Sequence, residues 1–176
     1  MFKTVKKNIR VERVTDKTAR VVMILFSALF FMRVTTVFIA DRLCSISMAA
    51  EKGRISANRA ITLLDLAAGL DSTNADIYFK KYKFLGSQPG KTGSRPLRQQ
   101  QLRLLRRCVN LRPSWPAYHL YYALTLKRTR PRPNIQTRRL ILDQLEQAAE
   151  LKPYSRLYRS ILKKYHPTEA ARPKTR

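Results

Sequence analysis

The chain has 176 residues, of which 44% are hydrophobic, and 36 Lys and Arg against 11 Asp and Glu give a formal net charge of +25. This hydrophobic fraction excludes a wholly disordered chain, and only 5 glycines argue against a glycine-rich nucleotide-binding fold. Two cysteines cannot make a disulfide scaffold, and two histidines leave little for a metal site. The composition therefore favours a binding or scaffolding protein of about one domain, without cofactor or metal.

The chain begins with a basic segment, residues 1–20, whose net charge is +5. An apolar run follows at residues 21–40, with Arg33 as its single charged residue. About 20 apolar residues can cross a bilayer as a helix. Arg33 is costly at the bilayer centre, but it lies near enough to the end of the run to reach the far interface. We therefore predict an uncleaved, single-pass transmembrane anchor at residues 21–42.

Other interpretations of the apolar run fit less well. A helix that is apolar on every face has no place in the core of a chain this small and this charged. Cleavage as a signal peptide is disfavoured because Phe38 stands two residues before Ala40, and Glu12 and Asp16 oppose a mitochondrial targeting peptide. The basic residues before the run predict a cytoplasmic amino terminus with the rest of the chain across the membrane. In a bacterium this means an inner-membrane protein with a periplasmic domain.

The remaining chain repeats one pattern three times, at residues 63–78, 104–118 and 142–158. Equivalent residues of successive stretches are 41 and 40 positions apart. A leucine, a small residue and a second leucine recur at intervals of three: Leu64, Ala67 and Leu70; Leu105, Cys108 and Leu111; Leu145, Ala148 and Leu151. Pro113 and Pro153 follow the last leucine by two positions, where the first stretch has Ser72. A period of this size is typical of stacked helical hairpins.

The spacing of these residues is that of one helix face, and a proline ends one helix and suits the first turn of the next. The predicted helices are residues 56–70, 75–85, 97–111, 115–127, 135–151 and 154–165.

The pattern resembles the tetratricopeptide repeat family over about residues 56–165. The resemblance rests on the second helix of each unit, on the Leu-x-Pro boundaries at Leu111 and Leu151, and on a tyrosine early in the next helix, namely Tyr78, Tyr118 and Tyr158. The period is longer than the family's 34 residues, the family's small residue in the first helix is matched only by Ala123, and the first unit lacks its proline. A plain helical bundle is the alternative.

The resemblance implies an all-α, tetratricopeptide-repeat-like domain, and we predict a short helical-hairpin array at residues 43–165 that follows the N-terminal transmembrane helix. The prolines and charges of residues 166–176 predict a flexible tail. The resemblance also implies non-catalytic binding of a peptide or a partner helix on a concave face. The array is expected to hold two full units with a half-unit at each end. Such arrays normally need about three units to be stable.

One loop looks at first like a phosphate-binding motif. Residues 85–93 read LGSQPGKTG, but only three residues separate Gly86 from Gly90, and Leu85 stands where a P-loop requires glycine. The segment also follows a predicted helix rather than a strand. We therefore expect a flexible loop between helices.

The remaining polar residues do not suggest a catalytic or metal site. Asp65, Asp71 and Asp76 are the nearest to an acidic cluster, and Asp76 suits the first turn of a helix. His119 and His166 lack cysteine or acidic neighbours at ligand spacing. Cys108 is expected in the core and Cys44 free, and neither is paired in sequence with a base. The sequence predicts that the protein is not an enzyme.

Charge is the more informative signal. Between Asp76 and Asp143 lie 66 residues without an acidic side chain, and they contain 16 Lys and Arg. A solvated helix face normally mixes both signs, so this composition favours an anionic partner. The predicted basic face consists of Lys80, Lys83, Arg103, Arg106, Arg107, Lys127 and Arg128.

These observations predict a membrane-anchored, non-catalytic scaffold or adaptor that binds a protein partner, for example in a bacterial envelope or polysaccharide-export assembly. Anionic lipid or polysaccharide is a further ligand of the basic face. The alternative is an RNA-binding or ribonucleoprotein subunit that uses residues 77–142. That alternative is disfavoured because the tyrosines available for stacking on bases occupy repeat packing positions: Tyr78, Tyr82, Tyr118, Tyr121 and Tyr122.

Overall fold

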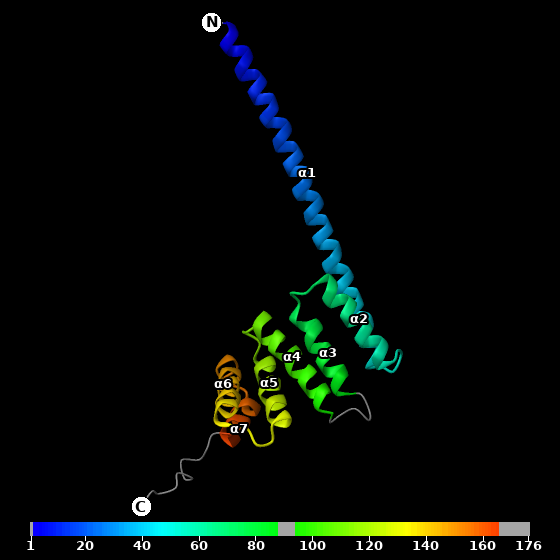
Figure 1. Ribbon diagram of the computed structural model, residues 1–176, viewed down its shortest axis with the longest axis vertical. Coiled ribbons are helices and arrows are strands. Elements are labelled where there is room, and N and C mark those ends of the chain that lie inside the picture. The colour runs from blue at the N-terminus through cyan, green and yellow to red at the C-terminus, as the bar shows by residue number, and fades with distance from the viewer. Residues whose placement is uncertain (1, 88–93, 166–176) are drawn as a thin grey trace, which may run out of the picture.

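The computed structural model describes residues 2–87 and 94–165, with side chains from residue 17 onward. These residues form seven α-helices and one short 3-10 helix, without a strand among them (Figure 1). The helices are α1 (Phe2–Ser47), α2 (Ala57–Leu70), α3 (Ala75–Gly86), α4 (Arg95–Leu111), α5 (Pro116–Thr129), α6 (Ile135–Leu151) and α7 (Arg156–Tyr165), with the 3-10 helix η1 at Met48–Ala50. The prediction of an all-α fold is confirmed, and each bound of the six predicted helices lies within two residues of the observed one.

Local sequence explains where the helices of the array begin. Side-chain oxygens of Ser56, Asn74 and Asn134 accept hydrogen bonds from backbone N–H groups in the first turns of α2, α3 and α6. Such caps satisfy donors that have no partner within the helix. A proline stands in the first turn of α4 and of α5, where its missing N–H costs nothing. Each of the three repeated leucine patterns ends its helix at the predicted leucine.

Helix α1 is continuous from the basic segment to the array, and its end from Ala40 to Ser47 packs into the array. Ala40, Cys44 and Ser47 are buried, and Ala40 and Cys44 share a core cluster with residues of α2. The end of α1 therefore forms the first hairpin together with α2, where the sequence had suggested only a half-unit. The predicted boundary between anchor and array, at residues 42 and 43, falls inside this helix.

The array continues with the hairpins α3–α4 and α5–α6 and closes with α7. The small residues of the three patterns, Ala67, Cys108 and Ala148, are fully buried, as are Leu64 and Leu105. A small side chain at this position lets neighbouring helices approach closely, as predicted. The last leucine of the third pattern, Leu151, differs, because it is 43% exposed. It lies at the carboxyl-terminal end of the array, where α7 is the last helix that the structure describes.

The apolar run on α1 is exposed. The side chains from Val21 to Phe38 lie outside any core, and Ala40 is the first buried residue of the run. The run therefore does not serve as the core of this chain. The described part of the chain has one helix, Lys17–Ala50, that is long and apolar enough to cross a membrane, judged by length and composition. The rest of the predicted basic segment before residue 17 is described as helical backbone only.

Candidate binding pocket

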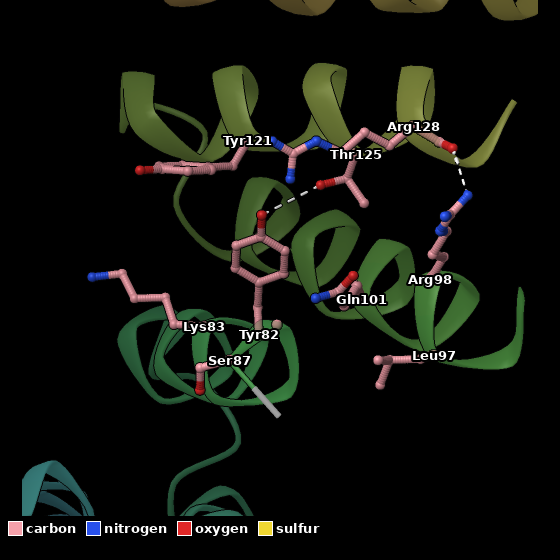
Figure 2. A pocket seen from close by; sticks show the side chains of 10 residues that line it. Tyr82, Lys83, Ser87, Leu97, Arg98, Gln101, Tyr121, Thr125 and Arg128 are labelled. Atoms are coloured by element: carbon pink, nitrogen blue, oxygen red, sulfur yellow. Dashed lines mark hydrogen bonds between the residues drawn. The ribbon is translucent and has the colours of Figure 1, made fainter. Parts of the chain in front are cut away.

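A pocket of about 520 Å³ opens between α3, the beginning of α4, and α5. Figure 2 shows its side chains directed from α3 and α4 on one side and from α5 on the other. It is lined by Tyr82, Lys83, Gly86, Ser87, Leu97, Arg98, Gln101, Tyr121, Thr125 and Arg128.

Aromatic packing fixes the distance between α3 and α5 beside this pocket. The Phe79 and Tyr82 rings are stacked with centroids 5.8 Å apart, and Tyr121 meets them at 5.3 and 5.9 Å. Phe79 also touches the fully buried ring of Tyr118 at 5.0 Å. Contacts of this kind stabilise a fixed arrangement beyond the area that they bury. The pocket therefore has a preformed aromatic wall.

The rest of the lining is polar and positively charged. Arg98 donates a hydrogen bond of 2.9 Å from Nη1 to the backbone oxygen of Arg128, which joins α4 to the end of α5 (Figure 2). The hydroxyls of Tyr82 and Thr125 lie 3.4 Å apart across the pocket. Lys83, Arg98 and Arg128 line the pocket, and none of its lining residues is acidic. The pocket therefore offers cations and neutral hydrogen-bonding groups to an anionic ligand.

The seven residues of the predicted basic face do not lie together. Lys83 and Arg128 share the pocket, whereas Lys80 is half-buried with its Nζ 3.2 Å from Cys44 Sγ of α1. Arg103 and Arg106 are exposed on α4. By helical spacing Arg103 lies on the side opposite Arg98 and Gln101, and Arg106 is turned about 80° from Arg98 and about 140° from Gln101.

The two remaining cations cover aromatic rings. The Arg107 guanidinium lies 4.5 Å from the centroid of the Tyr78 ring, and Lys127 Nζ lies 4.1 Å from that of Tyr165. Both contacts are of the cation–π type. The basic residues of α3, α4 and α5 thus point in several directions rather than forming one surface.

Of the residues that line the pocket, only Lys83 and Arg128 were among the predicted site residues, and Arg98 and Gln101 are polar lining residues that the sequence analysis missed. Their three-residue spacing places them on one face of α4 with the buried Leu105. That spacing was the available signal, because residues three and four apart share one face of a helix.

The tyrosines are divided between core and pocket. Tyr78 and Tyr118 are buried, as predicted for repeat packing positions, and Tyr82 and Tyr122 are half-buried. Tyr121 is 38% exposed at the pocket. Few of these rings are therefore open to stack on bases.

The three aspartates do not form a carboxylate pair. Asp65 pairs with Lys81, and Asp71 pairs with Arg33 at 3.5 Å. Asp76 lies in the first turn of α3, as predicted, and accepts a hydrogen bond of 2.6 Å from the Tyr118 hydroxyl. Burial, together with this hydrogen bond, raises the pKa of Tyr118. The aspartates thus connect helices.

The remaining candidates also have structural environments. His119 is buried, with Nε2 2.6 Å from the Pro113 carbonyl oxygen and Nδ1 2.9 Å from Gln144 Oε1. Cys44 and Cys108 are free and buried, as the sequence suggested for Cys108 in the core. Burial, and to a lesser extent the charge of Asp76, raises the pKa of Cys108 to about 12, so its thiol stays protonated at neutral pH. Within the described residues no group of three potential metal ligands comes together.

Two predicted features lie outside the described residues. The glycine-rich loop is described only at Leu85, Gly86 and Ser87, where α3 ends, and the segment 88–93 is not described. His166 and the predicted tail at residues 166–176 also fall outside.

Among solved structures, the chain is similar to the tetratricopeptide-repeat domain of Arabidopsis OM64. The superposition has a TM-score of 0.55 at 14% sequence identity, and it covers 74% of this chain and 97% of that domain. The fold resembles a tetratricopeptide-repeat array. No protein-family model matches the sequence, and no curated protein does either.

Proposed function

We propose that the protein is a membrane-anchored, non-catalytic adaptor that binds an acidic segment of a protein partner in the pocket between α3, α4 and α5. The observation that carries this proposal is the lining of the pocket, which combines Lys83, Arg98 and Arg128 with tyrosine, threonine and glutamine side chains. A carboxylate entering it would meet charge-assisted donors beside an aromatic wall. These features suit a short acidic peptide lying in the groove.

The anchor in this proposal is the exposed apolar run of α1. Its side chains from Val21 to Met32 have no partner within the described core, and lipid would cover them. The basic residues before it favour a cytoplasmic amino terminus with the array across the membrane. In a bacterium the array would then face the periplasm, where it could serve an envelope or polysaccharide-export assembly.

Site-specific photocrosslinking in native membranes tests the pocket. Benzoylphenylalanine replaces Tyr121, which lines the pocket, or Arg103, which lies on the opposite side of α4. We expect defined protein adducts from position 121 and none of the same mass from position 103.

Charge reversal supplies the matched control for this experiment. Lys83→Glu combined with Arg128→Glu should abolish the adducts formed at position 121, because a carboxylate ligand would be repelled. Arg103→Glu combined with Arg106→Glu changes the net charge equally and should leave the adducts intact. Adducts that are indifferent to both pairs contradict the proposal, and adducts removed by ribonuclease support the RNA-binding alternative.

A further inference from the structure

Three turns of the array lie along one edge. Each joins the end of an even-numbered helix to the next helix, and they comprise residues 71–74, 112–115 and 152–155. We call them together the turn edge. Figure 1 shows the turn edge on the side of the array from which α1 rises.

Contacts between neighbouring turns fix this edge. Arg107 near the end of α4 donates from Nη2 to the backbone oxygen of Ser72 at 3.4 Å, and Arg112 lies 3.9 Å from Asp76. Farther along, Pro113 and Leu151 line one small cavity between α5 and α6. These contacts join the first two turns, and the third turn follows Leu151, which lies across the small cavity from Pro113.

One ion pair relates the turn edge to the apolar run of α1. Arg33 Nη2 lies 3.5 Å from Asp71 Oδ1, so the first turn sits directly beside the end of the uninterrupted apolar stretch Val21–Met32. If that stretch lies in a bilayer, as in the proposed function, the turn edge lies at the bilayer surface. The 12 residues from Val21 to Met32 span about 18 Å as a helix, so this placement requires the bilayer to thin around α1 and the flanking basic side chains to reach outward to the headgroups.

The side chains of the turn edge suit such a surface. Three aromatic residues of the array, within the part that the structure describes, are exposed: Tyr121 in the pocket, and Trp115 and Tyr154 on the turn edge. Trp115 is 44% exposed and Tyr154 is 92% exposed. Tryptophan and tyrosine concentrate at the level of lipid headgroups, because their rings are apolar at one end and polar at the other.

Basic residues accompany these rings. The Arg112 guanidinium lies 4.6 Å from the centroid of the Trp115 ring, and Lys152 precedes Tyr154 by two residues. Of the acidic residues near them, Asp71 is paired with Arg33, and Asp76 accepts from Tyr118 beside Arg112. Glu150 is exposed at the end of α6, where it lines the cavity with Pro113 and Leu151. Long basic side chains reach lipid phosphates while their stems stay against apolar groups.

We propose that the turn edge rests in the headgroup layer of an anionic membrane, with Trp115 and Tyr154 among the headgroups and Arg112 and Lys152 against the phosphates. The array is then held at the surface by its edge as well as by its anchor. This inference rests on the proposed membrane anchor, but not on the ligand of the pocket.

Trp115 is the chain's single tryptophan, so its fluorescence reports the position of the turn edge directly. The full chain is reconstituted into vesicles of equal parts phosphatidylcholine and phosphatidylglycerol. We expect emission at shorter wavelength than in water, protection from iodide, and quenching by lipids brominated near the carbonyl end of their acyl chains. Trp115→Phe combined with Tyr154→Trp should behave in the same way.

Two comparisons make the test specific. Trp115→Phe combined with Tyr121→Trp moves the reporter into the pocket, where iodide should quench it and brominated lipid should not. Arg112→Glu with Lys152→Glu should lower quenching of Trp115 by brominated lipid at least about twofold, whereas Arg103→Glu with Arg106→Glu should not change it.

The proposed anchor and the proposed position of the turn edge are tested by different outcomes. Extraction of the chain from the vesicles by alkaline carbonate would overturn the anchor, and with it this inference. A chain that resists carbonate while iodide quenches Trp115 freely would overturn the turn edge alone. Protection from iodide without quenching by brominated lipid would indicate contact between copies of the chain and would also count against a lipid-facing edge.

Discussion

Arg33 and Asp71 form an ion pair between two parts of the chain that the sequence suggests are separate, the apolar run and the repeat array. The Asp71 side chain is 8% exposed, and its Oδ1 also accepts hydrogen bonds from the Thr73 N–H at 3.2 Å and from the Thr73 hydroxyl at 2.7 Å. The carboxylate therefore shapes the turn after α2 and at the same time fixes that turn against α1. A charged residue in an apolar run thus acquires a definite partner outside the run.

We expect Asp71→Ala to lower the free energy of unfolding by about 1–3 kcal/mol, because it removes a nearly buried carboxylate that accepts hydrogen bonds from Thr73 and pairs with Arg33. The measurement is thermal unfolding of the full chain in detergent, followed by circular dichroism. Asp65→Ala is the matched control, since that carboxylate is 54% exposed and pairs only with Lys81 among the contacts described. An exposed pair of this kind contributes about 0–1 kcal/mol. Equal losses in the two variants would mean that the Asp71 carboxylate stabilises the chain no more than an exposed ion pair does.

The helices were predictable from sequence because the signals that end them are local. A leucine ladder, a capping side chain and a proline each act within a few residues, so the bounds of α2 to α7 agree closely with the prediction. The end of the apolar run and the residues that follow it up to Ser47 gave a different signal. Their apolar character suits lipid as well as a core, and only the packing of Ala40 and Cys44 against α2 separates the two.

The pocket was less predictable than the fold. Charge counting singled out α3, α4 and α5, but it could not say that Lys80 turns toward Cys44 or that Arg107 lies over Tyr78. Those orientations depend on which helices become neighbours. Arg98 enters the pocket because α4 lies beside the end of α5, a relationship that no short motif records.

The small residue of each repeat limits how closely the helices pack, and this can be tested at Cys108. The thiol is fully buried and lies 3.4 Å from the Ala75 carbonyl oxygen of the neighbouring helix. We expect Cys108→Leu to destabilise the array by about 1–3 kcal/mol through overpacking. Asn110→Leu on the exposed side of the same helix should change stability by less than about 0.5 kcal/mol. If both variants unfold at the same temperature, close approach at this position is not required.

The raised pKa of the buried Cys108 thiol also leads to a prediction of how the stability of the chain depends on pH. Burial raises its pKa from 9.0 to about 12 in the folded chain, so the unfolded chain loses this proton at lower pH. The stabilisation is therefore fully present below pH 9.0 and is lost as the pH rises from 9.0 towards about 12. We expect the free energy of unfolding, measured with denaturant across this pH range, to fall less steeply with pH for Cys108→Ala than for the unchanged chain. Alanine suits this position because positions 67 and 148 of the other two repeats are alanines. Identical slopes for the two proteins would show that the thiol ionises equally easily in both states.

Gly53 occupies a backbone conformation that other residues rarely adopt, with φ at 69° in the connection between η1 and α2. We expect Gly53→Ala to cost about 1–2 kcal/mol, because a Cβ is strained in the left-handed region even where space is open. Gly69 provides the contrast, since it lies within α2 and an added Cβ would meet nothing within 4 Å. Gly69→Ala should therefore stabilise the helix by about 0.5–1 kcal/mol. The midpoints of thermal unfolding of the two variants should therefore shift in opposite directions. A shift in the same direction would mean that the connection after η1 does not hold this conformation in solution.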